Sequence, residues 1–470
     1  MLTTRERTPT TLRDALLGDD AYFSAWRARE LARVDREGLT YLDYTGAALY
    51  PESLVRGDAI RLGDAVLGNP HSEHGPSRAA TRDVESARRA ILDFLHADPA
   101  EYTVVLTTNA TAACRLVAES FAFRAGSVLA LAADNHNSVN GIREFARARG
   151  AKLATIPLDD ELRLVDPMSV LDAPGTAPSL FAFPAQSNFS GARHPLSLVA
   201  DARARGWRVL LDAASYVPTS ELRLSEVQPD FVALSMYKIA GYPSGVGALV
   251  ARHAALAELR RPSFAGGTVR WVSVQHGRHR LASGAAAFED GTVPFLAAGA
   301  VPAALAAVES AGRDRLARHL RTLTAELLFG LQALRHGNGA PVVRIHGPRT
   351  MEARGATIAM SLLARDGSPH PYWEVEEAAR ASQLAVRGGC FCNPGCSERA
   401  FGIAPDRAAA CLNELGEEFT IPGFAACLGG GTVGAVRLSL GLGSVREDVM
   451  RALEFFAGGR AGGSLARART

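Results

Sequence analysis

From about residue 102 to residue 250, short apolar runs alternate with amphipathic stretches of helical period. The runs are rich in β-branched and aromatic residues, and several end in polar residues, as buried strands do. Strands that alternate with helices along the chain pair in parallel, because each helix returns the chain to the same end of the sheet. We therefore predict an α/β domain with a mostly parallel central sheet. The predicted strands are YTVVLTT, SVLALAAD, KLATIPL, SLFAFPAQS, WRVLLDAAS and DFVALSMY.

A second apolar pattern of helical period runs from residue 301 to residue 335, after the loop FEDGTVPF. We predict one long helix here, leading into a second, smaller domain of α+β pattern. An N-terminal segment is expected to pack on that small domain, and a Gly/Ala/Arg-rich tail is expected to be disordered. The predicted bounds of the N-terminal segment, large domain, small domain and tail are 1–45, 46–300, 301–458 and 459–470.

The amino-acid composition limits the kinds of partner that the protein is expected to bind. The chain has 470 residues, enough for two domains and a deep cavity, and its 51 Lys and Arg nearly balance its 49 Asp and Glu. The net charge of +2 argues against a protein that binds nucleic acid or a membrane surface through bulk charge. The N-terminus has no apolar segment of the signal-peptide kind, and no uncharged run is long enough to cross a bilayer. We expect a cytoplasmic protein with a small-molecule partner.

Three of the six cysteines lie in the stretch VRGGCFCNPGC, at Cys390, Cys392 and Cys396. Six cysteines are too few for a disulfide framework, so we expect thiols. The C-x-C-x3-C spacing matches no common zinc or iron–sulfur pattern, so we expect no metal. We expect one reactive thiol, Cys392, beside Arg387, with Cys390 and Cys396 as packing residues or sulfur-relay helpers. The other cysteines are expected to be small buried hydrophobes: Cys114, Cys411 and Cys427.

Candidate chemistry gathers at the carboxyl ends of the predicted strands, where ligands bind in open α/β sheets. Lys238 follows the strand DFVALSMY and is trailed by glycines, and Asp212 ends the strand RVLLD. By itself such a lysine is more often a solvated strand end. Together, the two residues are what pyridoxal phosphate needs: a lysine that binds it covalently and a carboxylate that keeps its ring nitrogen protonated.

Three further stretches suit the same cofactor. Ala110 and Thr111 open a predicted helix, whose free N–H groups favour a phosphate. His136 lies in a loop where its ring could stack on a pyridine, and Gln186 and Asn188 supply amides for hydrogen bonds. Each stretch also has an ordinary structural explanation, as a helix cap, a surface histidine or turn residues.

These stretches, read in order, resemble a known family. YLDYTGAALY, NPHSEHGPS, DNHNSVNGIREFA, FAFPAQSNFSG, LLDAASYVPTS, YKIAGYPSGVGALV, FAGGTV and CFCNPGC are similar to the class V aminotransferase-fold enzymes. The resemblance runs from about residue 38 to residue 458 and is closest to the cysteine desulfurase domain of the molybdenum cofactor sulfurases. It implies the type I fold of pyridoxal-phosphate-dependent transferases, with pyridoxal 5'-phosphate as cofactor. Because the sequence ends at residue 470, we expect no C-terminal domain of the kind that holds molybdenum cofactor in the full-length sulfurases.

The resemblance also implies roles for single residues. Lys238 matches the lysine that binds the cofactor, Asp212 the partner of its ring nitrogen, His136 the stacking ring, and Asn188 an amide near its phenolic oxygen. Three residues match the phosphate cradle: Ala110, Thr111 and Ser235. Thr268 matches a residue that reaches the phosphate from a partner subunit, which implies a homodimer.

On the substrate side, Arg437 matches the arginine that pairs with the substrate carboxylate, and Cys392 the mobile-loop cysteine that accepts sulfur. Arg387 lies in RGG, which replaces the more usual RTG near the substrate entrance, as the start DYTGAA replaces a more usual Asp-His-Ala-Gly type. Tyr237 and Ser215 stand where desulfurases usually have a histidine and a glutamine.

We therefore expect a homodimeric cysteine desulfurase that acts on L-cysteine or an analogue. Lys238 or His136 would move the Cα proton, and Cys392 would take the sulfur as a persulfide and leave alanine. A protein or a small molecule would then accept the sulfur. Two alternatives stay open: a C–S or C–Se lyase, epimerase or other amino-acid-modifying enzyme on the same fold, and a catalytically silent scaffold.

Overall fold

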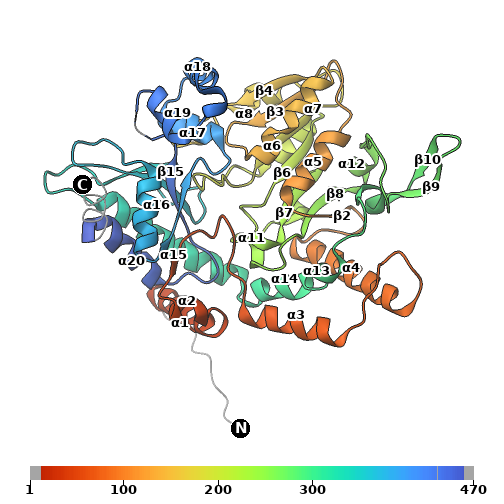
Figure 1. Ribbon diagram of the computed structural model, residues 1–470, viewed down its shortest axis with the longest axis horizontal. Coiled ribbons are helices and arrows are strands. Elements are labelled where there is room, and N and C mark those ends of the chain that lie inside the picture. The colour runs from red at the N-terminus through yellow and green to blue at the C-terminus, as the bar shows by residue number, and fades with distance from the viewer. Residues whose placement is uncertain (1–11, 431, 460–470) are drawn as a thin grey trace, which may run out of the picture.

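The computed structural model describes residues 12–430 and 432–459, which form two larger β-sheets, two pairs of short strands, and the helices around them (Figure 1). The larger sheet has seven strands in the order β2-β8-β7-β6-β5-β3-β4. All neighbours pair in parallel except β8, which is antiparallel to both β2 and β7. The predicted α/β fold with a mostly parallel sheet is confirmed. Its strands are β2 (Tyr102–Thr107), β3 (Val128–Ala132), β4 (Lys152–Ile156), β5 (Leu180–Pro184), β6 (Arg208–Asp212), β7 (Phe231–Ser235) and β8 (Gly247–Arg252).

Helices bury both faces of this sheet, which explains why its strands are apolar almost without interruption. Within β6, Leu210 packs with α5 and α7, whereas Val209 and Leu211 join the core that α4, α9 and α14 form on the opposite face. The helices between the first sheet residues and the small domain are α3 (Glu52–Asp64), α4 (Gly75–Phe94), α5 (Ala110–Ser120), α6 (Asn137–Asn140), α7 (Ile142–Ala148), α8 (Pro167–Leu171), α9 (Ser197–Ala204), α10 (Leu224–Val227), α11 (Met236–Ala240), α12 (His253–Glu258), η1 (Gly284–Phe288), α13 (Phe295–Ala298), α14 (Val301–Ser310) and α15 (Arg313–Ala333).

The prediction of a single helix over residues 301–335 is wrong. The chain forms α14 and α15, and the segment that ends with α14 meets α15 at an angle of 64°. The break falls at Gly312, whose φ of +79° is one that residues with a side chain rarely adopt. Both helices keep their apolar stripe, so the periodicity carries no sign of the bend. Among the described helices none is by itself long and apolar enough to cross a membrane; only the segments on the two sides of this bend, taken together, meet that test.

The smaller sheet is antiparallel, with the order β11-β12-β15-β14, and α16 (Tyr372–Ala381) packs against it. Its strands are β11 (Val343–His346), β12 (Thr357–Leu362), β14 (Arg387–Gly389) and β15 (Ala435–Ser439). The other elements outside the large sheet are α1 (Leu12–Glu30), α2 (Ala32–Arg36), β1 (Thr40–Tyr41), β9 (Val269–Ser273), β10 (Arg278–Leu281), β13 (Leu384–Ala385), α17 (Pro394–Phe401), α18 (Pro405–Leu415), η2 (Gly416–Glu418), α19 (Ile421–Cys427), α20 (Arg446–Glu454) and η3 (Phe455–Gly459).

The N-terminal segment lies against the C-terminal part of the chain. Strand β1 pairs in parallel with β13, and the ring of Phe23 stacks on His319 of α15 with centroids 4.3 Å apart. One continuous apolar core joins side chains of both sheets, so the boundary drawn at residue 300 stays a prediction. Of the tail predicted to be disordered, residues 460–470 lie outside the described residues.

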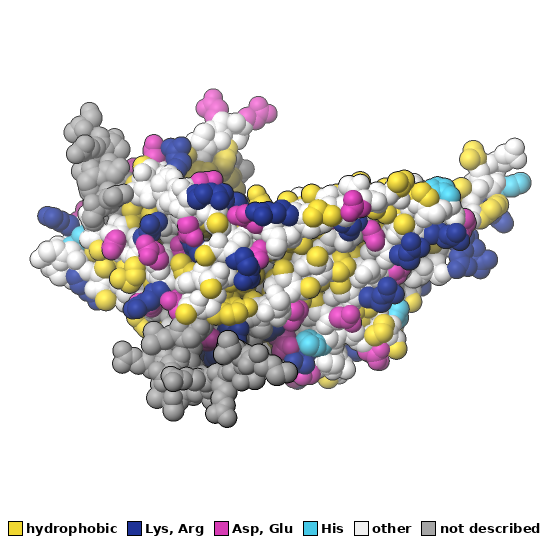
Figure 2. Space-filling view, turned by 90° about the horizontal axis from the view of Figure 1, so that it is seen from below, with side chains coloured by type: hydrophobic (Ala, Val, Ile, Leu, Met, Phe, Trp, Pro, Cys, Tyr) yellow, Lys and Arg dark blue, Asp and Glu magenta, His cyan; other side chains and the backbone are white. Residues whose placement is uncertain are grey.

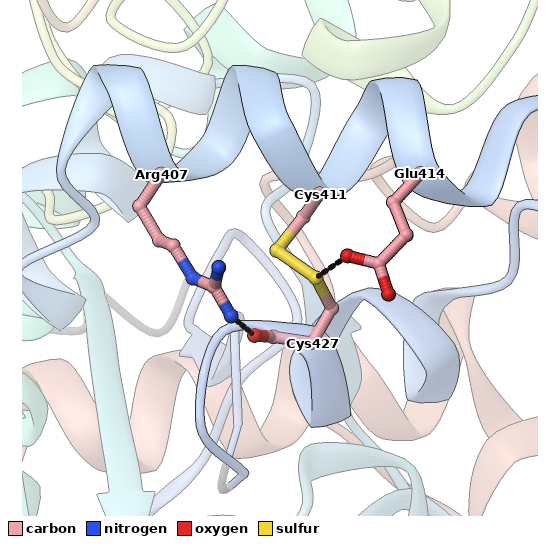
Figure 3. The surroundings of a disulfide bond; sticks show 4 residues. All are labelled: Arg407, Cys411, Glu414 and Cys427. Carbon is pink, nitrogen blue, oxygen red and sulfur yellow. Dashed lines mark hydrogen bonds between the residues drawn. A yellow bond between two sulfur atoms is a disulfide. The ribbon is translucent and has the colours of Figure 1, made fainter.

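A disulfide joins Cys411 of α18 to Cys427 of α19 (Figure 3). The expectation that both are unbonded small hydrophobes is therefore wrong. The two helices pack together and bring the Cα atoms to 5.8 Å, a separation that suits a disulfide. The 16-residue spacing of the two cysteines does not predict the disulfide, because the pairing depends on how the chain turns between the helices.

Candidate active site

A cavity of about 460 Å³ opens at the carboxyl ends of β5, β6 and β7, as the strand pattern predicts. Its lining is rich in polar groups and draws on segments up to 128 residues apart: Ala110, Thr111, His136, Ser138, Pro184, Gln186, Asn188, Asp212, Ala214, Ser215, Ser235, Tyr237 and Lys238. Most residues that the sequence proposes for a cofactor are thus together.

Lys238 lies in α11, one short helix turn after β7. The turn ends at Gly241, where φ is +73° and where a Cβ would meet the backbone N of Tyr50 at 2.5 Å, so only glycine fits. Burial lowers the pKa of the Lys238 amine, against the opposing attraction of Asp212. No hydrogen bond or ion pair holds this amine within the described part of the chain. A desolvated amine without a partner is suited to covalent attachment to a carbonyl.

Asp212 and His136 face the same cavity. Asp212 ends β6, and its Oδ1 accepts a hydrogen bond of 3.0 Å from the backbone N of Ala214. His136 caps α6, and its Nδ1 lies 2.9 Å from Oγ of Ser138. Burial lowers the pKa of His136, so the imidazole is held neutral near pH 7. A neutral ring is one that can stack on a pyridine or exchange a proton.

The start of α5 has the form of an anion cradle. Asn109 caps this helix, and the backbone N of Ala110 donates to Oγ of Ser235 at 2.8 Å. Oγ1 of Thr111 lies 2.7 Å from Oγ of Ser138. Ser138, which the sequence patterns did not indicate, links His136 to this cradle. Its only local signal is its place two residues after that histidine. These groups, with the helix N-terminus, suit a phosphate.

Thr268 does not join this cavity. It lies beside the base of the β9–β10 hairpin, which projects from the body of the molecule with apolar and basic side chains toward its tip (Figures 1 and 2). Its side chain is buried, and Oγ1 bonds to the backbone of Ala265 at 2.8 Å. A role at a cofactor held in a partner subunit therefore stays a prediction.

Arg437, proposed to bind a substrate carboxylate, already has an internal carboxylate partner. Its Nη2 lies 2.6 Å from Oδ1 of Asp43, and its Nη1 donates to the backbone O of Asn188 at 3.0 Å. Arg387 approaches the other oxygen of Asp43 at 3.6 Å. Burial lowers the pKa of Arg437, against the attraction of Asp43, and its Nε is buried without a partner. Asp43 thus stands between two arginines as a substrate carboxylate would.

The cysteine loop is tied to the cavity through its backbone. Phe391 and Cys392 both have a φ of +55°, a conformation that such residues rarely adopt. Nδ2 of Asn188 donates to the backbone O of Phe391 at 2.7 Å, and the backbone N of Asn137 donates to that of Cys392 at the same distance. Asn188 therefore holds the loop, in addition to facing the cavity. Cys392 does not itself line the cavity.

The three clustered cysteines have different surroundings. Cys390 and Cys392 are exposed thiols, whereas Cys396 is fully buried in α17 with its Sγ 3.7 Å from Oγ of Ser187. Burial raises the pKa of the Cys396 thiol, which makes it a poor nucleophile near pH 7. The guanidinium of Arg437 lies 4.6 Å from the ring centre of Phe391, which places a positive charge beside the loop.

Pyridoxal phosphate fits the residues present. The unpartnered Lys238 amine, the Asp212 carboxylate and the cradle at Ala110 lie around one cavity. Lys238 would hold its carbonyl carbon, Asp212 its ring nitrogen, His136 a face of the ring, and the start of α5 with Ser235 its phosphate.

Comparison with known proteins agrees with this geometry. The sequence is 36% identical over 457 residues to the molybdenum cofactor sulfurase of Bos taurus, covering 91% of this chain and 51% of that protein. It is 33% identical over 473 residues to that of Arabidopsis thaliana, covering 91% of this chain and 57% of the relative. The chain thus spans about half the length of these relatives.

Two solved structures share the fold. A cysteine desulfurase from Thermococcus onnurineus NA1 superposes with a TM-score of 0.76 at 23% identity, covering 93% of this chain and 98% of that one. The cysteine desulfurase CsdA from Escherichia coli gives 0.72 at 20% identity, covering 94% and 98%. Residues 40–451 match the family described as aminotransferase class-V, and the chain therefore belongs to that family.

Proposed function

We propose that this protein is a pyridoxal-phosphate-dependent cysteine desulfurase that moves the sulfur of L-cysteine onto Cys392 and releases alanine. The observation that carries the proposal is the exposed Cys392 thiol on a strained loop whose backbone is bound by Asn188 and Asn137, next to the Lys238 cavity. The similarity to molybdenum cofactor sulfurases and the fold shared with cysteine desulfurases support the same chemistry.

When bound, pyridoxal phosphate withdraws electrons from the bonds at the Cα of an amino acid. The protein's own groups prepare the substrate for this. Arg387, exposed and only loosely paired with Asp43, is placed to meet the incoming carboxylate first, and Arg437 can take it when Asp43 moves aside. Lys238, freed as the substrate binds, and His136 are the two groups positioned to move the Cα proton, since burial keeps a neutral form of each accessible.

Cys392 completes the reaction. Its thiolate attacks the substrate sulfur, so a new S–S bond forms as the substrate's Cβ–S bond breaks. The electron pair of the broken bond stays with the carbon skeleton, which takes up a proton and leaves as alanine. The transferred sulfur is oxidised and the carbon is reduced, so the step needs no outside oxidant. The enzyme persulfide then passes its sulfur to a small-molecule or protein acceptor.

The proposal includes a cytoplasmic homodimer in which Thr268 reaches the cofactor phosphate of the partner subunit. The projecting β9–β10 hairpin supports a dimer, because exposed Trp271, Val272 and Val274 gather on it. Sedimentation of the active enzyme tests this: activity in a monomer would contradict it.

One observation favours a second candidate, a C–S or C–Se lyase. Cys392 lies outside the lining of the cavity, and a lyase would need no protein thiol. Such an enzyme would release pyruvate in place of alanine.

Intact-protein mass spectrometry after incubation with L-cysteine separates the two. A desulfurase gains the mass of one sulfur atom on Cys392 and forms alanine, and Lys238→Ala abolishes both. Formation of pyruvate, with no gain of sulfur by the protein, would establish the lyase instead. The absence of any product would support a catalytically silent scaffold.

A further inference from the structure

A second cavity, of about 610 Å³, is lined by an unusual number of arginines. It is lined by residues of α15 and of the loop that leads from β11 to β12, with Arg193 and Thr219. We call it the arginine cavity, after Arg193, Arg318, Arg321 and Arg354. Its other lining residues are neutral: Thr219, Ala317, Leu320, Thr324, Met351, Gly355 and Ala356.

Three of the four arginines have no carboxylate partner within the described part of the chain. Arg354, only 4% exposed, donates to the backbone O of Pro348 at 2.8 Å, of Gly355 at 3.2 Å and of Thr357. Arg193 donates to Oε1 of Gln186 at 3.1 Å and Oγ of Ser220 at 2.5 Å.

Arg321 donates to the backbone O of Met351 at 3.2 Å, and Arg318 alone pairs with a carboxylate, that of Asp19 at 3.1 Å. The cavity therefore holds three positive charges that no acidic side chain of the described residues neutralises. Neutral oxygens satisfy the N–H groups of these arginines but not their charge.

This arrangement is costly without an added anion. Burial lowers the pKa of Arg354 to about 10, and the positive charges of Arg163 and Arg193 act in the same direction. Burial also lowers the pKa of Arg193, and Arg321 adds to the effect. Both remain charged near pH 7, so like charges are held together in a partly desolvated space, which an anion would relieve.

We propose that the arginine cavity binds a small molecule through a phosphate group. Guanidinium groups match phosphate oxygens with two parallel hydrogen bonds, and a phosphate dianion offsets most of the uncompensated charge. The neutral lining residues, Leu320, Met351 and Ala356 among them, offer contacts to a ligand beyond its phosphate, so the ligand class is a phosphorylated metabolite. The site is separate from the cofactor cradle at the start of α5, and the proposal does not depend on the desulfurase activity.

Gln186 connects the arginine cavity to the candidate active site. Its Oε1 accepts from Arg193, its Nε2 donates to the backbone O of Ser215 at 2.9 Å, and its side chain lines the cofactor cavity. Gly355 makes room for this side chain, since a Cβ there would lie 1.9 Å from Oε1. An anion that draws Arg193 away thus removes a hydrogen bond from a residue of the active site.

Titration calorimetry on the cofactor-saturated enzyme at low salt tests the site, because bound cofactor fills the other phosphate cradle. Pyrophosphate is the probe, and malonate is the carboxylate comparison. We expect saturable binding of pyrophosphate that weakens as salt is added. Arg321→Gln, at the exposed mouth, should weaken it about tenfold, the scale of one lost charged hydrogen-bond pair. Arg89→Gln, an exposed arginine of α4 outside the cavity, removes the same charge and should leave the affinity unchanged.

Three results would overturn the proposal: no binding by the wild type, equal affinity in Arg321→Gln and Arg89→Gln, or equal affinity for malonate and pyrophosphate. Should Arg321→Gln lose its fold by circular dichroism, Arg193→Gln takes its place, with the same weakening expected.

Discussion

Two pairs of cysteines that lie within forty residues of each other along the chain differ in whether they form a disulfide. Cys390 and Cys392 stay free and exposed although one residue separates them, whereas Cys411 and Cys427, separated by 16 residues, form a disulfide. In the loop, Asn188 and Asn137 bind backbone carbonyls, so the backbone is held while the thiols are left accessible. In the helix pair, the packing of α18 on α19 brings the two cysteines together. The separation of two cysteines along the chain therefore predicts a disulfide less well than the structure of the backbone that connects them.

The two regions also differ in charge. Arg437 lies over the ring of Phe391, which precedes Cys392, so a positive charge lies beside the loop of free thiols. At the disulfide, Oε2 of Glu414 lies 3.5 Å from Sγ of Cys427, while Arg407 is turned to the backbone O of Cys427 (Figure 3). A negative charge therefore lies beside the disulfide, and a positive charge lies beside the free thiols.

Replacing the free thiol should have the largest effect. Cys392→Ser should reduce sulfur transfer from L-cysteine at least about a hundredfold, because a hydroxyl is a far weaker nucleophile than a thiolate, and cofactor absorbance should not change. Cys390→Ser is the matched control and should keep activity within about threefold. Equal losses in both variants would remove the distinction between the two thiols.

Removing the disulfide should affect stability and not turnover. The double variant Cys411→Ser, Cys427→Ser should lower the free energy of unfolding of the α18–α19 pair by about 3 kcal/mol, the scale for a closed loop of this length. Hydrogen exchange of the two helices measures it. A parallel fall in sulfur transfer would show that the bonded region takes part in the reaction after all.

Displacing the loop without touching a thiol should give an intermediate effect. A Cβ at Gly395 would lie 2.0 Å from the backbone O of Ala133, so Gly395→Ala must shift the start of α17 and the loop before it. We expect about a tenfold loss of persulfide formation with cofactor binding unchanged. Gly63→Ala, in α3 where an added Cβ would meet no atom within 4 Å, is the control for activity, and similar losses in the two would argue against a positioning effect.

The smallest effect is expected at the charge beside the disulfide. Glu414→Gln should speed reduction of Cys411–Cys427 by dithiothreitol about threefold at low salt, because the carboxylate repels the attacking thiolate. Added salt should erase the difference. Glu417→Gln, exposed in η2, should have no effect; if it matched Glu414→Gln, the local contact would not be the cause.

Local patterns predicted the framework of the molecule well. Each of the six predicted strands lies within the run that named it, because a buried strand needs continuous apolar residues and the polar residue after it marks its end. Asp212 was found because it ends β6, and Lys238 and His136 because they lie three and four residues after β7 and β3. Strand β8 was not predicted, and the bend at Gly312 was missed because a positive φ at one glycine leaves the apolar period unchanged. The other missed features depend on contacts between separate parts of the chain: the disulfide, Ser138 beside Thr111, and Asp43 beside Arg437.

The pairing of Asp43 with Arg437 has a consequence for how the protein is made. The two residues are 394 positions apart, and Asp43 comes from the first part of the chain to be synthesised. All the residues that line the cofactor cavity precede the end of β8 at Arg252, so they leave the ribosome well before Arg437 does. Until then Asp43 is without this partner. A chain interrupted before residue 437 would therefore contain every residue of the cavity lining but lack the arginine proposed to pair with a substrate carboxylate.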